Sequence, residues 1–148
     1  MILFLRLTRQ KKNASGTIKL LLTKELEVMS IRGIRGATTV EENSKDVILA
    51  ETRKLIHQII EKNQLNKEDI ASIFFSLTHD LDSTFPALAA RELQLTYTPL
   101  LCFNEIAVPG SLEKCIRILM HVNLETKQED IKHIYLNRAA ALRPEFAS

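Results

Sequence analysis

The first clear pattern of apolar residues along the chain spans residues 31–40, IRGIRGATTV. β-Branched and aliphatic side chains dominate this run, which is typical of a strand. Gly33 and Gly36 interrupt the run and indicate a kink or a close approach of the backbone to another group. We therefore predict a first strand here, against which a ligand could lie.

The period of the apolar positions changes to that of a helix over residues 44–63. Ser44 is a suitable N-cap and Asn63 a suitable stop, so a helix is predicted between them. Residues 70–77, IASIFFSL, then form a short apolar run, which predicts a strand buried on both faces. The apolar residues at helical spacing are Ile48, Leu55, Ile56, Ile59 and Ile60.

A shorter helix is predicted next, because Pro86 suits a first helical turn, with Ser83 or Thr84 as the cap and ALAARELQL as the body. Residues 98–106, TPLLCFNEI, read as another strand. Both elements are short, and the loop THDLDST precedes the helix.

A second long helix is predicted over residues 111–123, SLEKCIRILMHVN, because Pro109 and Gly110 break the chain and Ser111 offers a cap. Residues 133–142 read as a final strand. Strands and helices thus alternate along the chain. This order indicates a single α/β (α+β) domain in which helices cover a mixed β-sheet.

Composition then narrows the classes of function. The 148 residues are 45% hydrophobic, which suffices for the core of one compact domain. Aromatic residues make up only 5% and Trp is absent, so few rings can stack on bases and no nucleic-acid partner is expected. No apolar run approaches the ~20 residues that span a bilayer, so no membrane association is expected.

The formal net charge of +2 is unevenly distributed. Residues 1–28 hold six Lys and Arg against two Glu, which leaves 14 basic against 16 acidic residues from Met29 onward. The opening segment has no useful period and lacks the long apolar centre of a signal peptide. We expect residues 1–28 to be a non-native or mis-assigned extension and residues 29–148 to be the functional domain.

Cys102 and Cys115 have neither CxxC nor Cys/His metal spacing. Without a convincing export signal, two reduced thiols in a cytoplasmic protein are expected, and a disulfide between them stays open. The chain also lacks a phosphate loop, a dinucleotide glycine fingerprint, an HExxH motif and a recognisable nucleophile setting. We expect neither a metal nor a cofactor.

Arginines on or near the predicted strands are the most distinctive polar residues, together with a carboxylate, Glu105, at a strand end. Guanidinium groups bind carboxylates in a bidentate manner, so several in one cleft suit a small dicarboxylate ligand. Composition alone favours a simpler interpretation, in which these groups are solvated charges or ion pairs. The arginines are Arg32, Arg35, Arg117 and Arg143.

Three other side chains have simple structural interpretations. Tyr135 suits a half-buried core ring with a wet hydroxyl. Cys102 suits a small buried hydrophobe, and Phe85 suits a hydrophobic staple at the start of the shorter helix. None of them decides the function alone.

The string IRGIRGATTVEEN, residues 31–43, resembles the amino-terminal signature of the monofunctional, trimeric α/β chorismate mutases of bacteria. Further matches follow in order and extend the resemblance over residues 29–144: THDLDSTFPALAARE, TPLLCFNEI, KCIRILMHVN and HIYLNRAAALRP. The resemblance implies an isomerase that converts chorismate to prephenate in phenylalanine and tyrosine biosynthesis. It also implies a homotrimer, built as a pseudo-α/β-barrel, with active sites between subunits.

The resemblance places the catalytic groups at Arg117, Glu105 and Arg35. Arg117 is expected beside the ether oxygen and a carboxylate of chorismate, Arg35 at a carboxylate, and Glu105 at the ring hydroxyl. Tyr135 is expected to bind the side-chain carboxylate, and Cys102 to contact the hydroxyl region. The residues expected to line or close the pocket are Phe85, Ala87, Leu88, Arg91, Leu142 and Arg143.

The chain departs from the family pattern at a few positions. Leu88 stands where relatives can carry lysine near the pocket mouth, so weaker steering of the substrate is expected. A one-residue deletion around residues 95–97 is expected only to shorten a turn. The tail after Pro144 is short, which leaves open its role as a flexible cover.

The implied reaction is a Claisen rearrangement, in which an ether C–O bond breaks as a C–C bond forms within one molecule. It requires no nucleophile, metal or acid, so catalysis would come from selecting the compact conformer and placing fixed charge where charge develops. Two alternatives stay open because fold does not dictate function. They are a trimeric imine or enamine deaminase and a non-catalytic trimer that binds a small anion.

Overall fold

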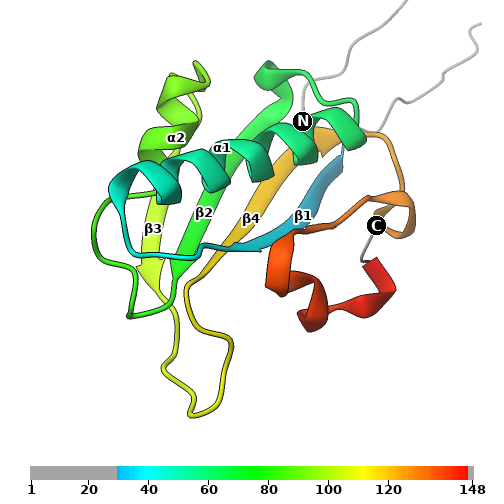
Figure 1. The fold of residues 1–148 in the computed structure, drawn as a ribbon. Helices are drawn as coiled ribbons and strands as arrows, with labels where there is room; N and C mark the ends of the chain where they lie inside the picture. The colour runs from blue at the N-terminus through cyan, green and yellow to red at the C-terminus, as the bar shows by residue number, and fades with distance from the viewer. Residues whose placement is uncertain (1–29, 147–148) are drawn as a thin grey trace, which may run out of the picture.

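The computed structural model describes residues 30–146, which form one layer of β-sheet and one layer of α-helix (Figure 1). The expected extension over residues 1–28 lies outside the described residues and stays a prediction. The strands are β1 (Ser30–Thr39), β2 (Ile70–Leu77), β3 (Leu100–Asn104), β4 (Cys115–Leu124) and β5 (Ile134–Tyr135). The helices are α1 (Lys45–Lys62), α2 (Ala87–Glu92) and the short 3₁₀ helices η1 (Lys67–Asp69), η2 (Gln128–Asp130), η3 (Asn137–Leu142) and η4 (Pro144–Phe146).

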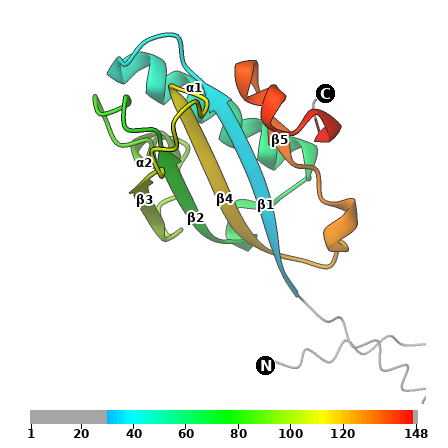
Figure 2. The same ribbon diagram turned by 90° about the horizontal axis from the view of Figure 1, so that it is seen from below.

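The five strands form one mixed sheet in the order β3-β2-β4-β1-β5. β4 is antiparallel to both β1 and β2, whereas β3 runs parallel to β2 and β5 parallel to β1. The predicted single α/β domain with a mixed sheet is therefore confirmed. Figure 2 shows the segment from β5 to η4 alongside β1, at the edge of the sheet.

The long helix α1 forms where its pattern predicted. The hydroxyl of Ser44 accepts a hydrogen bond from the Val47 N–H at 3.4 Å, and Asn63 is the C-cap. Its buried stripe includes Ile48, Leu55, Ile56 and Ile59 and packs on the sheet. Among the described residues, no helix is long and apolar enough to cross a membrane.

The predicted helix over residues 111–123 is wrong, because Cys115–Leu124 is the central strand β4. Ile116, Ile118, Met120 and Val122 are buried, and their neighbours between them are more exposed, which is the period of a strand. β-Branched residues favour this conformation. The break at Pro109 and Gly110 belongs to the loop between β3 and β4, where Gly110 has φ +78°.

Two further predictions are corrected at the ends of elements. The final strand is only Ile134–Tyr135, because Asn137 adopts φ 52° and starts η3. The helix α2 has Pro86 as N-cap and no side-chain cap from Ser83 or Thr84. Phe85 is 71% exposed, so it does not act as a staple within the chain.

Both α-helices lie on the same face of the sheet (Figure 1), whereas within residues 30–146 the opposite face is covered only in part, by η3 and η4. β2 therefore buries Ile73 and Phe75 against the helices, whereas Phe74 and Ser76 on the other side are half-buried. The prediction that β2 is buried on both faces is wrong for the single chain. We call this second side of the sheet the open face.

The close approach predicted at the glycines applies to Gly36. A Cβ atom there would lie 2.8 Å from Cδ1 of Ile59 and 3.1 Å from Cδ1 of Leu55, both on α1. At Gly33 the nearest atom, Cδ1 of Leu119, would lie at an ordinary 3.7 Å. Gly36 thus lets α1 settle on β1.

We predict that Gly36→Ala lowers the free energy of unfolding by about 1–3 kcal/mol, because the added methyl group overpacks the contact between α1 and β1. Urea unfolding followed by circular dichroism measures the change. Gly33→Ala is the matched control and should stay within about 0.5 kcal/mol of the parent protein. Equal destabilisation by both substitutions would contradict the tight contact.

Candidate active site

A cavity of about 530 Å³ opens on the open face of the sheet. Five of the predicted site residues line it: Arg35, Arg117, Tyr135, Leu142 and Arg143. The rest of the lining comes from backbone and side chains of β1, β2, β3 and β4, namely Gly36, Ala37, Phe74, Phe75, Ser76, Phe103, Ile118 and Leu119. The sheet thus brings together arginines that lie far apart in the sequence.

Strand register explains why Arg117 has space around it. In the sheet Arg117 pairs with Ala37 on β1 and with Ser76 on β2. Both neighbours have small side chains, which leave free space beside the Arg117 side chain. Arg35 lies in the next row, opposite Leu119, and Tyr135 pairs with Ala37 from β5.

Glu105 faces Arg117 from the end of β3. Its backbone N–H donates to the Leu77 carbonyl at 2.8 Å, which fixes the residue next to β2. Its Oε2 accepts a hydrogen bond from the Ser76 hydroxyl at 2.5 Å and lies 3.6 Å from Nε of Arg117. Glu105 and Arg117, both expected at the substrate, therefore lie side by side within one chain.

The guanidinium of Arg117 has a donor that none of residues 30–146 satisfies. Its Nε atom is buried and has no hydrogen-bond partner, and the distance to Glu105 is that of an ion pair rather than a hydrogen bond. A buried donor without a partner costs about 1–3 kcal/mol. A ligand oxygen placed at this atom would recover that free energy.

A second group of contacts gathers around Phe146, which was not among the predicted site residues. The Cζ atoms of Arg35 and Arg143 lie 5.5 and 5.1 Å from the centroid of its ring. Tyr135 stacks on the same ring with centroids 6.2 Å apart. An aromatic residue close behind Pro144 was the only sequence signal for this contact, which joins the chain end to the cavity.

His133 contacts the backbone of Arg35 close to this group of residues. Its Nδ1 accepts a hydrogen bond from the Arg35 backbone N–H at 3.1 Å, which requires a neutral ring with the proton on Nε2. Burial, followed by the charges of Arg35 and Arg143, lowers the pKa of His133. The arginines thus place fixed positive charges at the cavity, and the neutral ring of His133 beside Arg35 adds no further charge to them.

Glu145 offsets part of this charge at the outer rim. It accepts a hydrogen bond from Nε of Arg143 at 2.6 Å. Its own backbone amide and then Arg143 lower the pKa of this exposed carboxyl. Arg35 and Arg117 have no such acidic partner at hydrogen-bonding distance among the described residues. The net positive cavity suits a small ligand with two carboxylates.

The remaining predicted residues lie elsewhere in the chain. Cys102 is on the side of β3 that faces the helices, because it pairs with the buried Phe75. Burial raises the pKa of its thiol, and a backbone hydrogen bond from Ala87 and the charge of Arg91 act in the opposite direction. The residues at this edge, outside the cavity, are Phe85, Ala87, Leu88, Arg91 and Cys102.

Two smaller points complete the comparison with the prediction. Cys102 and Cys115 are both free thiols, so the disulfide left open by the sequence is absent. Arg32 does not line the cavity, and its Nε donates to the Thr126 carbonyl at 2.6 Å. Within residues 30–146, no cluster of His, Cys, Asp and Glu is arranged to hold a metal ion.

Comparison with known proteins gives one consistent result. The sequence model of the family described as chorismate mutase type I matches residues 31–146. Chorismate mutase AroH of Bacillus subtilis (strain 168) is 45% identical over 120 residues, which cover 80% of this chain and 94% of the relative. Chorismate mutase AroH of Thermus thermophilus is 44% identical over 119 residues, which cover 80% and 98%.

The solved structures agree with the sequence comparisons. The structure of the chorismate mutase from Clostridium thermocellum is 58% identical in sequence and superposes with a TM-score of 0.73. The match covers 74% of this chain and 97% of that chain. The two-layer fold described above is thus shared with a protein of known structure.

We predict that His133 makes stability sensitive to mild acid. Because its pKa is lower in the folded state than the ordinary 6.5, the unfolded chain takes up a proton first as the pH falls. Stability is therefore complete above about pH 6.5 and declines below it, by about 1 kcal/mol or less. Thermal unfolding between about pH 7 and pH 5 measures the decline.

His133→Asn removes the titrating ring and keeps an acceptor near the Arg35 N–H, so this variant should lose less stability over the same interval. His57→Asn is the control, because His57 is an exposed histidine on α1 with 70% of its side chain accessible. An identical decline in all three proteins would contradict the role of His133.

Proposed function

The chain belongs to the type I chorismate mutase family, and we propose that the cavity on the open face binds chorismate with Arg117 at the reacting ether oxygen. The function is that of a chorismate mutase, an isomerase of aromatic amino acid biosynthesis. The observation that carries the assignment of the site is Arg117, whose side chain lines the cavity and whose buried Nε has no hydrogen-bond partner among the described residues.

The reaction explains why a fixed cation is useful at this place. As the ether C–O bond lengthens, negative charge grows on the oxygen. A guanidinium that is already held in position stabilises this charge without reorganising, so it favours the transition state over the bound substrate. Ala37 and Ser76 leave the space for the oxygen to approach Arg117.

Glu105 has an electrostatic role in this proposal. Its carboxylate is held by the Ser76 hydroxyl and by the backbone bond to Leu77. It would accept a hydrogen bond from the ring hydroxyl of chorismate and stabilise the partial positive charge that develops on the ring fragment in the transition state. No proton is transferred, because the rearrangement requires none.

The two carboxylates of the substrate have partners at the other end of the cavity. Arg35 and Tyr135 lie in adjacent strands there, and Arg143 follows η3. Binding both carboxylates while the ether oxygen stays at Arg117 would hold the molecule in its compact conformer, in which the two reacting carbons are close.

We propose that a homotrimer completes the site. Arg91, Phe85 and Cys102 do not line the cavity of their own chain, although the family resemblance places them at the substrate. The open face also leaves apolar side chains uncovered, including Leu101, Phe103 and Leu119. A neighbouring subunit that covers this face with its β3 and α2 edge would bury them and supply the missing residues.

Two further predictions from the sequence concern the alternative functions and the location of the protein. The deaminase and anion-binding alternatives are not favoured, because the family match and the curated relatives all concern chorismate mutases. We propose the cytoplasm as the location, which the free thiols of Cys102 and Cys115 support.

We predict that Arg117→Ala lowers kcat for chorismate by about 100- to 1000-fold, the usual effect of removing one preorganised donor. Loss of chorismate absorbance measures the rate, and chromatography identifies prephenate. Arg32→Ala is the matched control, since Arg32 lies on β1 outside the cavity and should leave turnover within about twofold of the parent. A folded Arg117→Ala protein with unchanged kcat would overturn the assignment.

A further inference from the structure

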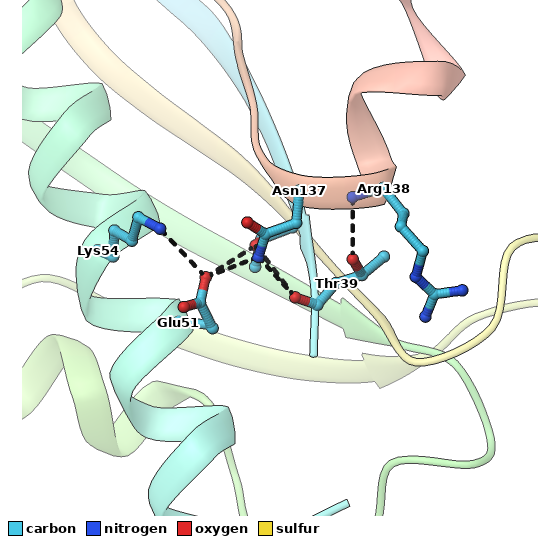
Figure 3. Close-up of polar contacts among 6 residues, drawn as sticks. Thr39, Glu51, Lys54, Asn137 and Arg138 are labelled. Carbon is cyan, nitrogen blue, oxygen red and sulfur yellow. Dashed lines mark hydrogen bonds and ion pairs between the residues drawn. The ribbon is translucent and has the colours of Figure 1, made fainter. Parts of the chain in front are cut away.

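A second set of polar contacts lies behind the cavity, where α1 and the end of β1 meet the start of η3 (Figure 3). We infer that Glu51 on α1 and Asn137 form a positioning pair that sets Leu142 and Arg143 at the substrate. The inference rests on the proposed function, because its effect is measured as binding of chorismate.

Asn137 is the centre of these contacts. Its Nδ2 donates to Oε2 of Glu51 at 2.9 Å, to the Thr39 carbonyl at 2.9 Å and to the Thr38 hydroxyl at 3.1 Å. The next residue, Arg138, donates its backbone N–H to the Thr39 hydroxyl at 3.2 Å. One amide group therefore ties the start of η3 to both β1 and α1.

The carboxylate of Glu51 is a demanding partner because it is mostly removed from water. Its side chain is 24% exposed, and Oε2 also accepts from the fully buried Thr38 hydroxyl at 3.3 Å. Nζ of Lys54, on the same helix, lies 3.8 Å from Oε2 of Glu51, and the lysine side chain is half exposed. This distance is too long for a hydrogen bond, so Lys54 does not replace the bond from Asn137. Loss of that bond leaves a shielded acceptor poorly satisfied.

The backbone changes direction at Asn137, between β5 and η3. Its φ of 52° lies in the left-handed region, which asparagine tolerates better than most residues. It lies two residues after the end of β5 and starts η3, which has no side-chain cap hydrogen bond at its N-terminus. A six-residue 3₁₀ helix has little stability of its own, so its orientation depends on such anchors.

The other end of η3 lies at the cavity. Leu142 is its last residue and Arg143 is its C-cap, and both line the cavity. Arg117 and Glu105 come from β4 and the end of β3, which this anchor does not touch. Loosening the anchor should therefore weaken substrate binding and leave the chemical step intact, so that KM rises while kcat holds.

The test inverts the hydrogen bond between the two side chains. Asn137→Asp keeps a residue that accepts the left-handed backbone, but sets its carboxylate against that of Glu51. Adding Glu51→Gln restores one donor and one acceptor in the opposite sense. Steady-state kinetics with chorismate gives kcat and KM for the parent, both single variants and the double variant.

We expect Asn137→Asp to raise KM about three- to tenfold with kcat within about twofold, a change equivalent to the net contribution of one ordinary hydrogen bond. The double variant should recover at least about half of that change, and Glu51→Gln alone should be nearly neutral. If Asn137→Asp does not fold, Glu51→Ala provides the same test with an expected rise of about two- to fivefold.

Asn63→Ala is the matched control. The Asn63 side chain also makes three hydrogen bonds: one to the Ile59 carbonyl within α1, and two to the backbone of Lys132 that join α1 to the C-terminal part of the chain. None of the three reaches η3. This variant should lose thermal stability with KM unchanged. Equal effects of Asn137→Asp and Asn63→Ala on stability, with KM unchanged in both, would overturn the inference, and so would a double variant without recovery.

Arg143→Ala separates this inference from the proposed function. A raised KM in Arg143→Ala, together with an unchanged KM in Asn137→Asp, contradicts only the positioning pair. An unchanged KM in Arg143→Ala contradicts the proposed binding of chorismate at this end of the cavity, and the inference falls with it.

Discussion

Close packing of α1 against one side of the sheet determines where the cavity side chains that come from the strands can lie. Gly36 brings β1 close to Leu55 and Ile59, and this side of the sheet is filled. Because side chains alternate along a strand, the residues between the buried ones must point to the other side. Arg35 and Arg117 are such residues, so the core that stabilises the domain also fixes the positions of its cations.

The open face combines charge with incomplete burial. Arg117 keeps an unsatisfied Nε, Phe146 lies between Arg35 and Arg143, and His133 is held neutral beside them. Such a surface is costly for a single chain, because donors and apolar rings both lack partners. In the proposed trimer, a dianionic substrate would offset the cost of the unpaired donors, and a neighbouring subunit would offset the cost of the exposed apolar rings. The proposal thus assigns binding, catalysis and assembly to one side of one sheet.

The periodicity of the sequence predicted much of the fold, and its failures have physical reasons. β1, α1 and β2 were predicted within one or two residues, because period, caps and chain breaks agreed. β4 was taken for a helix, since Pro109 and Gly110 were read as a helix start although the residues from Ile116 onward alternate. The residue types alone pointed to Arg35 and Arg117 as candidates, and the family resemblance gave them and Tyr135 their expected roles. Asn137 and Phe146 were not predicted, because docking of a chain end onto a strand leaves no periodic signal.

In the proposed trimer, the cavity of one subunit is completed by the α2 edge of another, and mixed assemblies test this arrangement most directly. Arg117→Ala and Arg91→Ala proteins would first be assayed alone for their residual activity, then co-refolded in equal amounts and assayed again with chorismate. If the two residues act from different subunits, roughly a quarter of the sites contain both arginines and activity returns to about that level. If mixtures shown by mass to contain mixed trimers recover no activity, Arg91 and Arg117 do not combine across subunits. That result would contradict the proposed site between subunits.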